Sequence, residues 1–200
     1  MARLEFFYDC SSPWTYLAFH RIEEIVQGHD AELIWRPILV GGVFNTVNPS
    51  VYENRPKPVK VKAAYYSKDL ADWARAYGLR IGKPPVFPVN SVKAMRGAFV
   101  ALEHDCVSPY SRAVFERYWG DLCDISQDDV LRPIVEGVGL DWGELSAKIA
   151  DPGYKQKLRD NTDELISRGG FGSPTMFVDG EDMYFGNDRL PLVEMALEGK

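Results

Sequence analysis

Ser11-Ser12-Pro13-Trp14-Thr15 joins two segments of opposite character. Before it, residues 4–8 read Leu-Glu-Phe-Phe-Tyr, a short apolar and aromatic run that predicts a buried strand. After it, residues 16–25 carry apolar side chains at helical spacing. Ser12 stands where a helix N-cap is expected, and Pro13 takes the first helical position, where proline is best tolerated. The sequence therefore predicts a strand-to-helix junction with a hydroxyl side chain at its corner.

Such a corner favours an anion, because unpaired N–H groups and the positive end of the helix dipole point toward it. An ordinary Ser-Pro helix start without a ligand explains the same residues and, for this stretch taken alone, is the favoured interpretation. Ser12 is thus a candidate for an anion site, and the choice between such a site and a simple helix cap depends on the remainder of the chain.

Composition and charge limit the classes of function that are open to this chain. Hydrophobic residues make up 46% and aromatic residues 12% of the 200 residues, which indicates a packed globular protein. A formal net charge of -6 argues against nucleic-acid binding, which requires a basic surface. No apolar run approaches the roughly 20 residues of a membrane helix, and the first strand starts too near Met1 for a leader segment. We therefore expect a cytoplasmic protein with no membrane or nucleic-acid partner.

The three cysteines are Cys10, Cys106 and Cys123, and no two of them form a C-x-x-C pair. Only three histidines are dispersed among them, so neither a disulfide framework nor a metal site is predicted. We expect reduced thiols. Cys10 lies two residues from Ser12, but a buried packing role is favoured over a reactive thiol.

The order of elements indicates the architecture. Residues 31–38 predict a second strand, and a strand–helix–strand opening of this size favours a parallel pair. Residues 45–58, rich in Asn and Pro, predict a long loop. Near the end, Asp179-Gly180 predicts the turn of a β-hairpin, and a last helix is expected to begin near Arg189. Helical patterns without a recurring period fill the middle, at residues 61–77, 91–104, 109–119, 141–149 and 151–167, with another start at Ser126.

This βαβ, helices, ββα order resembles the thioredoxin-like fold of DsbA-type proteins with a helical insertion. The chain resembles, over nearly its whole length, the family of bacterial 2-hydroxychromene-2-carboxylate isomerases and kappa-class glutathione transferases. The resemblance implies an α/β fold, with residues 1–58 and 168–200 forming the thioredoxin-like domain and residues 59–167 the inserted helical domain. The motifs that carry it, in order, are Phe7-Tyr8-Asp9, Ser12-Pro13-Trp14-Thr15, Lys62-Ala63-Ala64-Tyr65, Phe87-Pro88-Val89-Asn90, Phe171–Val178 and Phe185–Leu190.

Ser12-Pro13-Trp14-Thr15 takes the place of the Cys-Pro-x-Cys motif of the redox relatives. A pair of hydroxyl groups cannot form a disulfide, so dithiol exchange through this site is excluded. The resemblance implies instead that Ser12 Oγ holds the thiol of bound glutathione, a cofactor, and stabilises its thiolate, with Pro13 beside it. A hydrogen-bond donor and a helix N-terminus both lower the pKa of a thiol.

Other parts of glutathione are assigned by the same resemblance. Ser173-Pro174 matches a cis-proline whose preceding backbone groups pair with the cysteinyl part, although a trans proline opening an edge strand also fits the residues alone. Asn187, Asp188 and Arg189 are expected to meet the γ-glutamyl end, and Asn187 or Asp188 also suits a helix cap.

Two assignments rest on weaker matches. Lys62 is the candidate for the glycyl carboxylate, with a merely solvated charge as the alternative. The family also uses an asparagine in the preceding loop, and here Asn48 is chosen while Asn45 and Asn54 stay open.

The second substrate is expected to be a small aromatic molecule. Trp14, Phe44, Tyr65 and Phe87 are candidates for an aromatic pocket, although core packing also explains each of them. Asn90 and Arg96 are candidates for a substrate carboxylate, with a surface charge as the alternative for Arg96.

The resemblance favours a glutathione-dependent isomerase that interconverts 2-hydroxychromene-2-carboxylate and trans-o-hydroxybenzylidenepyruvate. A kappa-like glutathione transferase or peroxidase is the first alternative, and a non-catalytic glutathione- or peptide-binding protein is the second. The resemblance also implies a homodimer.

Overall fold

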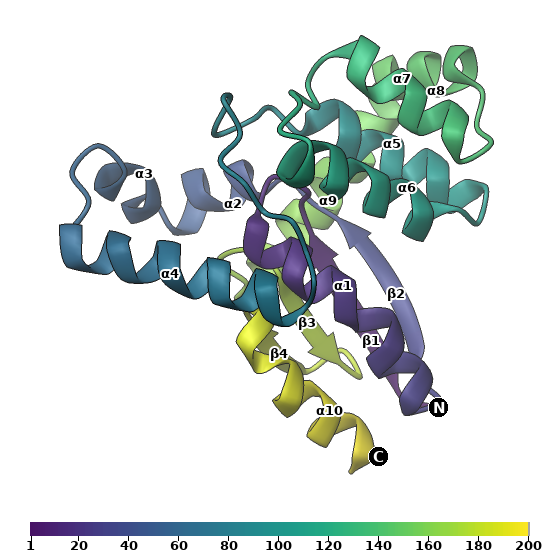
Figure 1. Cartoon of the computed structure of the whole chain (residues 1–200). Coiled ribbons are helices and arrows are strands. Elements are labelled where there is room, and N and C mark those ends of the chain that lie inside the picture. Colours follow the sequence, from purple (N-terminus) through teal and green to yellow (C-terminus); the bar gives the residue numbers. More distant parts are fainter. Residues whose placement is uncertain (200) are drawn as a thin grey trace.

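A computed structural model describes residues 1–199 (Figure 1). Its centre is a four-stranded sheet in the order β2-β1-β3-β4. Strand β1 pairs in parallel with β2, and antiparallel with β3, which forms a hairpin with β4. The predicted thioredoxin-like α/β arrangement is confirmed. The strands are β1 (Arg3–Tyr8), β2 (Glu32–Pro37), β3 (Thr175–Val178) and β4 (Asp182–Phe185).

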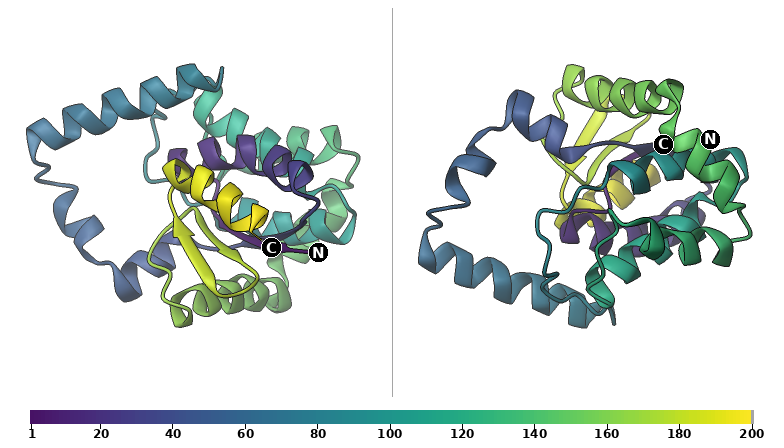
Figure 2. Two further views of the ribbon diagram at one scale, coloured as in Figure 1. Left: turned by 90° about the horizontal axis from the view of Figure 1, so that it is seen from below. Right: turned by 90° about the horizontal axis from the view of Figure 1, so that it is seen from above.

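Helices cover both faces of this sheet. Helices α1 (Pro13–Gly28) and α10 (Leu190–Glu198) lie on one face, and α9 (Pro152–Ser167) lies on the other (Figure 2). Side chains of β1 alternate between the faces, so Phe6 packs in the larger core cluster and Phe7 in the smaller one that contains Leu165 of α9. A strand buried on both faces reads as a continuous apolar run, which explains the sequence pattern of residues 4–8.

The middle of the chain is helical, as predicted. Helices α5 to α8 gather beside β2, whereas α4 runs along the other side of the molecule, near α1 (Figure 1). Asp141 and Asp151 cap two of the helices by accepting backbone N–H groups. The elements are α4 (Lys60–Ala76), α5 (Val92–Glu103), α6 (Val107–Phe115), a π-helical turn (Glu116–Gly120), α7 (Asp128–Gly137) and α8 (Trp142–Ala150).

The boundaries proposed for the two domains stay a prediction. Helix α9, placed by the sequence in the insertion, packs on the sheet of the thioredoxin-like part. Residue 200, the last of the predicted segment 168–200, lies outside the described residues. No helix among residues 1–199 is long and apolar enough to cross a membrane.

The prediction of a loop over residues 45–58 is wrong for most of the segment up to Asn54. Helix α2 (Val40–Val47) and the short helix α3 (Ser50–Asn54) occupy most of it. Helix α2 begins without a side-chain cap and contains two glycines, so the local sequence does not predict a helix there. Tertiary packing supplies the stability, because Val43 is fully buried in the cluster that holds Phe7.

Candidate functional site

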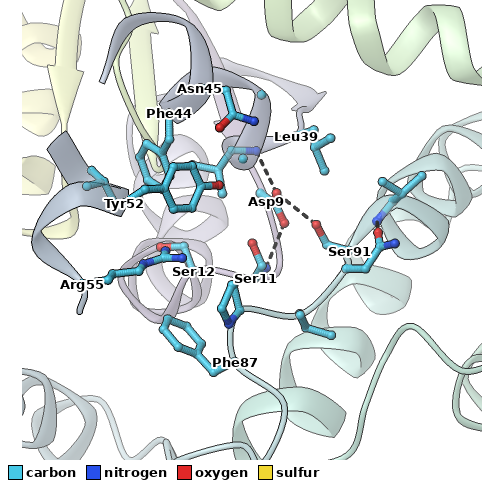
Figure 3. A pocket seen from close by; sticks show the side chains of 18 of the residues that line it. Asp9, Ser11, Ser12, Leu39, Phe44, Asn45, Tyr52, Arg55, Phe87 and Ser91 are labelled. Atoms are coloured by element: carbon cyan, nitrogen blue, oxygen red, sulfur yellow. Dashed lines mark hydrogen bonds between the residues drawn. The ribbon is translucent and has the colours of Figure 1, made fainter. Parts of the chain in front are cut away.

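Two cavities flank the beginning of α1, and Trp14 lines both of them. The first, of about 520 Å³, is called the Ser12 cavity. The second, of about 320 Å³, is called the cis-proline cavity because Ser173 and Pro174 line it. The Ser12 cavity is drawn in Figure 3, and its lining includes Asp9, Ser11, Ser12, Phe44, Tyr52, Arg55, Phe87, Asn90 and Ser91.

Ser12 lines the first cavity and contacts Ser173, which lines the second. Its Oγ accepts a hydrogen bond from Thr15 N at 3.2 Å, which confirms the predicted N-cap. The same hydroxyl donates to the carbonyl oxygen of Ser173 at 3.3 Å, a long bond for two oxygen atoms. Ser12 therefore has one hydroxyl proton, weakly held, at the positive end of the 16-residue helix α1.

The segment opposite Ser12 is fixed by hydrogen bonds to Asp9, the residue after β1, and to α1. The Ser173–Pro174 bond is cis, as predicted. Ser173 Oγ shares a hydrogen bond with Thr15 Oγ1 at 2.8 Å and accepts from Asp9 N at 3.1 Å. Thr15 is fully buried and Ser173 nearly so. The segment before β3 is thus held against the start of α1, which sets the position of the Ser12 hydroxyl.

Asp9 is a fully buried carboxyl group at the floor of the Ser12 cavity (Figure 3). Its Oδ1 accepts from Ser11 N at 2.9 Å, and its Oδ2 accepts from Val40 N at 2.9 Å and Ser91 Oγ at 3.1 Å. Burial raises the pKa of Asp9 despite these three bonds, which lower it. Asp9 links three segments: the β1–α1 corner, the start of α2, and the residues that precede α5.

Aromatic side chains and one cation line the remainder of the Ser12 cavity. The rings of Phe44 and Tyr52 meet edge to face with centroids 5.9 Å apart. The guanidinium carbon of Arg55 lies 4.8 Å from the ring centroid of Tyr52 and 5.4 Å from that of Phe87. Within residues 1–199, Arg55 has no ion pair. This cavity combines aromatic side chains with an unneutralised positive charge.

The cis-proline cavity is polar at one end. Asn187 is 3% exposed, and its Nδ2 is buried with no hydrogen-bond partner in the described chain. Asp188 and Arg189 pair with each other at the same end. Gly186 donates its N–H to Pro174 O at 3.1 Å, which joins this end to the cis-proline. The opposite wall comes from α4, through Tyr66, Asp69 and Trp73.

The structure thus gathers most of the predicted glutathione residues around one cavity, but not all of them. Lys62 is exposed on α4, one turn from Tyr66 on the same helical face, and does not line the cavity. Asn48 donates to Phe171 O and accepts from Ser50 Oγ, so its amide joins the end of α2 to the loop before the cis-proline. Asn45 lines the Ser12 cavity instead. The binding roles of Lys62 and Asn48 stay predictions.

The predictions for the second substrate divide in the same way. Phe44, Phe87 and Asn90 line the Ser12 cavity together with Trp14. Tyr65 is 60% exposed on α4 and lies outside this cavity, as does Arg96. Arg96 points away from the Ser12 cavity: its Nη1 donates to Ile149 O of α8, and its side chain lines a different cavity together with residues of α9.

Several functional candidates escaped the sequence reasoning. Asp9 follows a buried strand directly, a position that would have been a usable signal. Tyr52 and Arg55 fall where a loop was predicted, and Ser91 carries no local signal. Cys10 behaves as predicted: it is 1% exposed, and burial together with the charge of Asp9 raises the pKa of its thiol well above the usual value. Among residues 1–199, no cluster of His, Cys, Asp and Glu could hold a metal ion.

Comparison with known proteins finds relatives that share the sequence and the fold over nearly the whole chain. Residues 3–198 match the model of the DSBA-like thioredoxin domain. The chain is 30% identical to 2-hydroxychromene-2-carboxylate isomerase of Pseudomonas putida, over 97% of this chain and 93% of the relative. It is 29% identical to human glutathione S-transferase kappa 1, over 98% and 91% of the two chains. The solved structure of a 2-hydroxychromene-2-carboxylate isomerase superposes with a TM-score of 0.84 at 28% identity, covering 98% of this chain and 95% of that one.

Proposed function

The chain belongs to the DSBA-like thioredoxin domain family and is related to 2-hydroxychromene-2-carboxylate isomerases and kappa-class glutathione transferases, and from this premise we propose that it is a glutathione-dependent isomerase. Its proposed reaction interconverts 2-hydroxychromene-2-carboxylate and trans-o-hydroxybenzylidenepyruvate. The observation that carries the proposal is that Ser12 lines the aromatic, cationic Ser12 cavity and also donates to Ser173, which lines the cis-proline cavity.

Glutathione fits the residues of the cis-proline cavity. The unpartnered Nδ2 of Asn187 is a buried donor that requires an acceptor, and a carboxylate of the γ-glutamyl end is one. Asp188 offers an anion to the γ-glutamyl ammonium, and Arg189 a cation to the carboxylate. With this end at residues 187–189, the cysteinyl part would lie beside Ser173 and Pro174.

The thiol of glutathione supplies a nucleophile that adds reversibly to an unsaturated keto acid and leaves again after the bond beside it has rotated. Ser12 prepares this thiol. Its hydroxyl proton, held by Ser173 O only at 3.3 Å, is free to turn to the sulfur atom. Thr15 N continues to donate to Ser12 Oγ, which polarises the hydroxyl and strengthens it as a donor. The N-terminus of α1 adds its dipole, so both groups favour the thiolate.

The Ser12 cavity receives the aromatic keto acid in this proposal. Phe44, Tyr52 and Phe87 offer ring surfaces to a planar body. Arg55 offers two parallel N–H donors to the carboxylate, and its positive charge has no competing acidic partner in the described chain. Asp9 holds the floor through Val40 N and Ser91 Oγ, so the start of α2 stays in place beneath the substrate.

The decisive experiment measures interconversion of the two isomers by their absorbance, with glutathione at a small fraction of the substrate concentration. An isomerase completes many turnovers per glutathione and leaves total free thiol constant. Loss of thiol in proportion to product would identify a transferase instead. No detectable glutathione binding in calorimetry would overturn both enzyme assignments.

A pair of variants tests the substrate site separately. Arg55→Gln should raise the KM of the keto acid about tenfold, because a charge-assisted hydrogen bond contributes roughly 1.5–3 kcal/mol, and should leave glutathione affinity unchanged. Lys57→Gln is the matched control, since Lys57 is an exposed cation two residues away that does not line the cavity. Equal effects of the two substitutions would exclude Arg55 as the carboxylate partner.

A further inference from the structure

A third cavity, of about 390 Å³, lies between α2, α5 and α9 and is called the Arg96 cavity. It shares the lining residues Leu39, Gly42 and Val92 with the Ser12 cavity, so the two cavities are neighbours. Neither Ser12 nor any residue of the cis-proline cavity lines it. Its volume falls in the range of about 300–1,000 Å³ that is typical of small-molecule sites.

Arg96 is the most constrained cation of this cavity. Its Nη1 donates to Ile149 O, at the end of α8, at 2.8 Å. Its Nε is buried and has no hydrogen-bond acceptor in the described chain. Because Nη1 is committed, the edge formed by Nε and Nη2 has no acceptor in the described chain, and this edge is the one that binds a carboxylate with two parallel bonds. Nε is covered in this structure, so a carboxylate that reaches it must first displace the side chains over it. A buried donor without an acceptor is costly, so an acceptor from outside the chain would stabilise it.

Two further cations stand on α9 at the same cavity. Lys155 has no acidic partner among residues 1–199. Arg159 pairs with Asp163 at 3.4 Å, but both side chains are largely exposed, and such a pair contributes little. With Arg96, Lys155 and Arg159 against Asp163, the cavity has an excess of positive charge in a chain whose net charge is -6.

The rest of the lining is apolar or already satisfied. Leu158 is buried, and Leu39 and Val92 are half-buried. Thr162 Oγ1 accepts from Leu39 N and donates to Leu158 O, so it has no free proton to donate to a ligand. We propose that the Arg96 cavity binds a small organic anion, with its carboxylate on the Nε–Nη2 edge of Arg96 and its apolar body against Leu39, Val92 and Leu158. This site is separate from the proposed catalytic one and does not depend on it.

Benzoate is a suitable probe, because it joins a carboxylate to a compact apolar body. The titration is made in the Arg55→Gln background, so that the other cationic cavity does not contribute. The readout is the side-chain Nε–H signal of Arg96 in ¹H–¹⁵N spectra, identified by its loss in an added Arg96→Gln substitution. We expect a saturable shift with a Kd of about 1 mM or tighter. Benzamide lacks the charge and phosphate lacks the apolar body, and each should bind at least about fivefold more weakly.

Substitutions locate the site by calorimetry with the same probe. Lys155→Gln, an exposed change that leaves the fold intact, should weaken benzoate binding about threefold, and Arg96→Gln about tenfold or more. Lys83→Gln is the control, since Lys83 is an exposed cation that lines none of the three cavities. An Arg96 Nε–H signal that stays unmoved up to about 20 mM benzoate would overturn the proposal. So would equal binding of benzamide, or benzoate binding unchanged by both Lys155→Gln and Arg96→Gln.

Discussion

Replacing Ser12 by alanine removes one oxygen atom with two described contacts. The cap from Thr15 N is lost, which costs about 1 kcal/mol of stability. The bond to Ser173 O is also lost, and at 3.3 Å it contributes less than the roughly 0.5–1.5 kcal/mol of a typical hydrogen bond. We therefore expect Ser12→Ala to fold, with an unfolding free energy lowered by about 1–2 kcal/mol.

The substitution should also change the pKa of the thiol of bound glutathione. A hydrogen bond to a charged group contributes about 1.5–3 kcal/mol, and the proton that makes it is withdrawn from Ser173 O, so the net gain is roughly 1–2 kcal/mol. One pKa unit corresponds to 1.36 kcal/mol. The pKa of the bound thiol should thus rise by about one unit in Ser12→Ala, while the dipole of α1 keeps it below that of free glutathione.

The assay is the thiolate absorbance of the saturated complex, titrated against pH. Asp141→Ala is the matched control, because Asp141 caps α8 by accepting from Glu144 N at 2.7 Å and lies outside the cavities that flank α1. It should lose similar stability and leave the thiol pKa unchanged. An equal thiol pKa in wild type and Ser12→Ala would refute the reasoning, since the helix terminus alone would then stabilise the thiolate.

Three further predictions concern stability. Hydrogen bonds from Lys157, Tyr154 and Lys148 overcome burial and lower the pKa of Glu103 to about 2, so the folded state gains stability above the ordinary value of 4.5 and loses it as pH falls. Glu103→Gln should therefore cost about 1 kcal/mol at pH 7, after discounting for solvent screening, and nothing near pH 2 in urea titrations. Gly186 has φ +100°, and a Cβ there would lie 2.7 Å from Asp188 Oδ1, so Gly186→Ala should lower the unfolding free energy by about 1–3 kcal/mol. Gly180→Ala is the control, because Gly180 also has a positive φ but a Cβ there would meet no neighbouring atom. An equal loss of unfolding free energy in this control would show that the contact with Asp188 is unimportant. In Asp9→Asn an amide NH₂ replaces one carboxylate oxygen, so at least one of the three donors to Asp9 would face another donor. The substitution should lower the unfolding free energy by about 1–3 kcal/mol. An unchanged urea midpoint would contradict the role of Asp9 in joining these segments.

The parts of the site that the sequence predicts are those with local causes. A serine before Pro13 caps a helix wherever that helix packs, and the N-cap of Ser12 is confirmed. The cis bond at Pro174 is also confirmed, but through resemblance to a family rather than through the residues alone. The predicted binding roles of Asn187, Asp188 and Arg189 remain to be tested, although the structure places all three at one cavity.

The parts of the site that the sequence does not predict depend on contacts between distant segments of the chain. Helix α2 has no cap of its own, and the hydrogen bond from Val40 N to Asp9 joins residues 31 positions apart. Arg55 reaches the Ser12 cavity only because the residues before it are helical and bring it over Tyr52. Arg96 has a plain helical context, so sequence spacing could not show that it faces Ile149 and α9 rather than Ser12.

The placement of β1 in the middle of the sheet has a consequence for how the chain is made. Leu4 pairs with Val178, so one side of the first strand stays without its partner until residue 178 has been translated. At ribosomal speeds of 5–20 residues per second, that interval is roughly 10–35 seconds. During this time the nascent chain can form the parallel pair of β1 and β2 and the central helices, but it exposes an apolar strand edge. Nascent chains stalled before β3 should therefore recruit chaperones, and release should follow synthesis of the final hairpin.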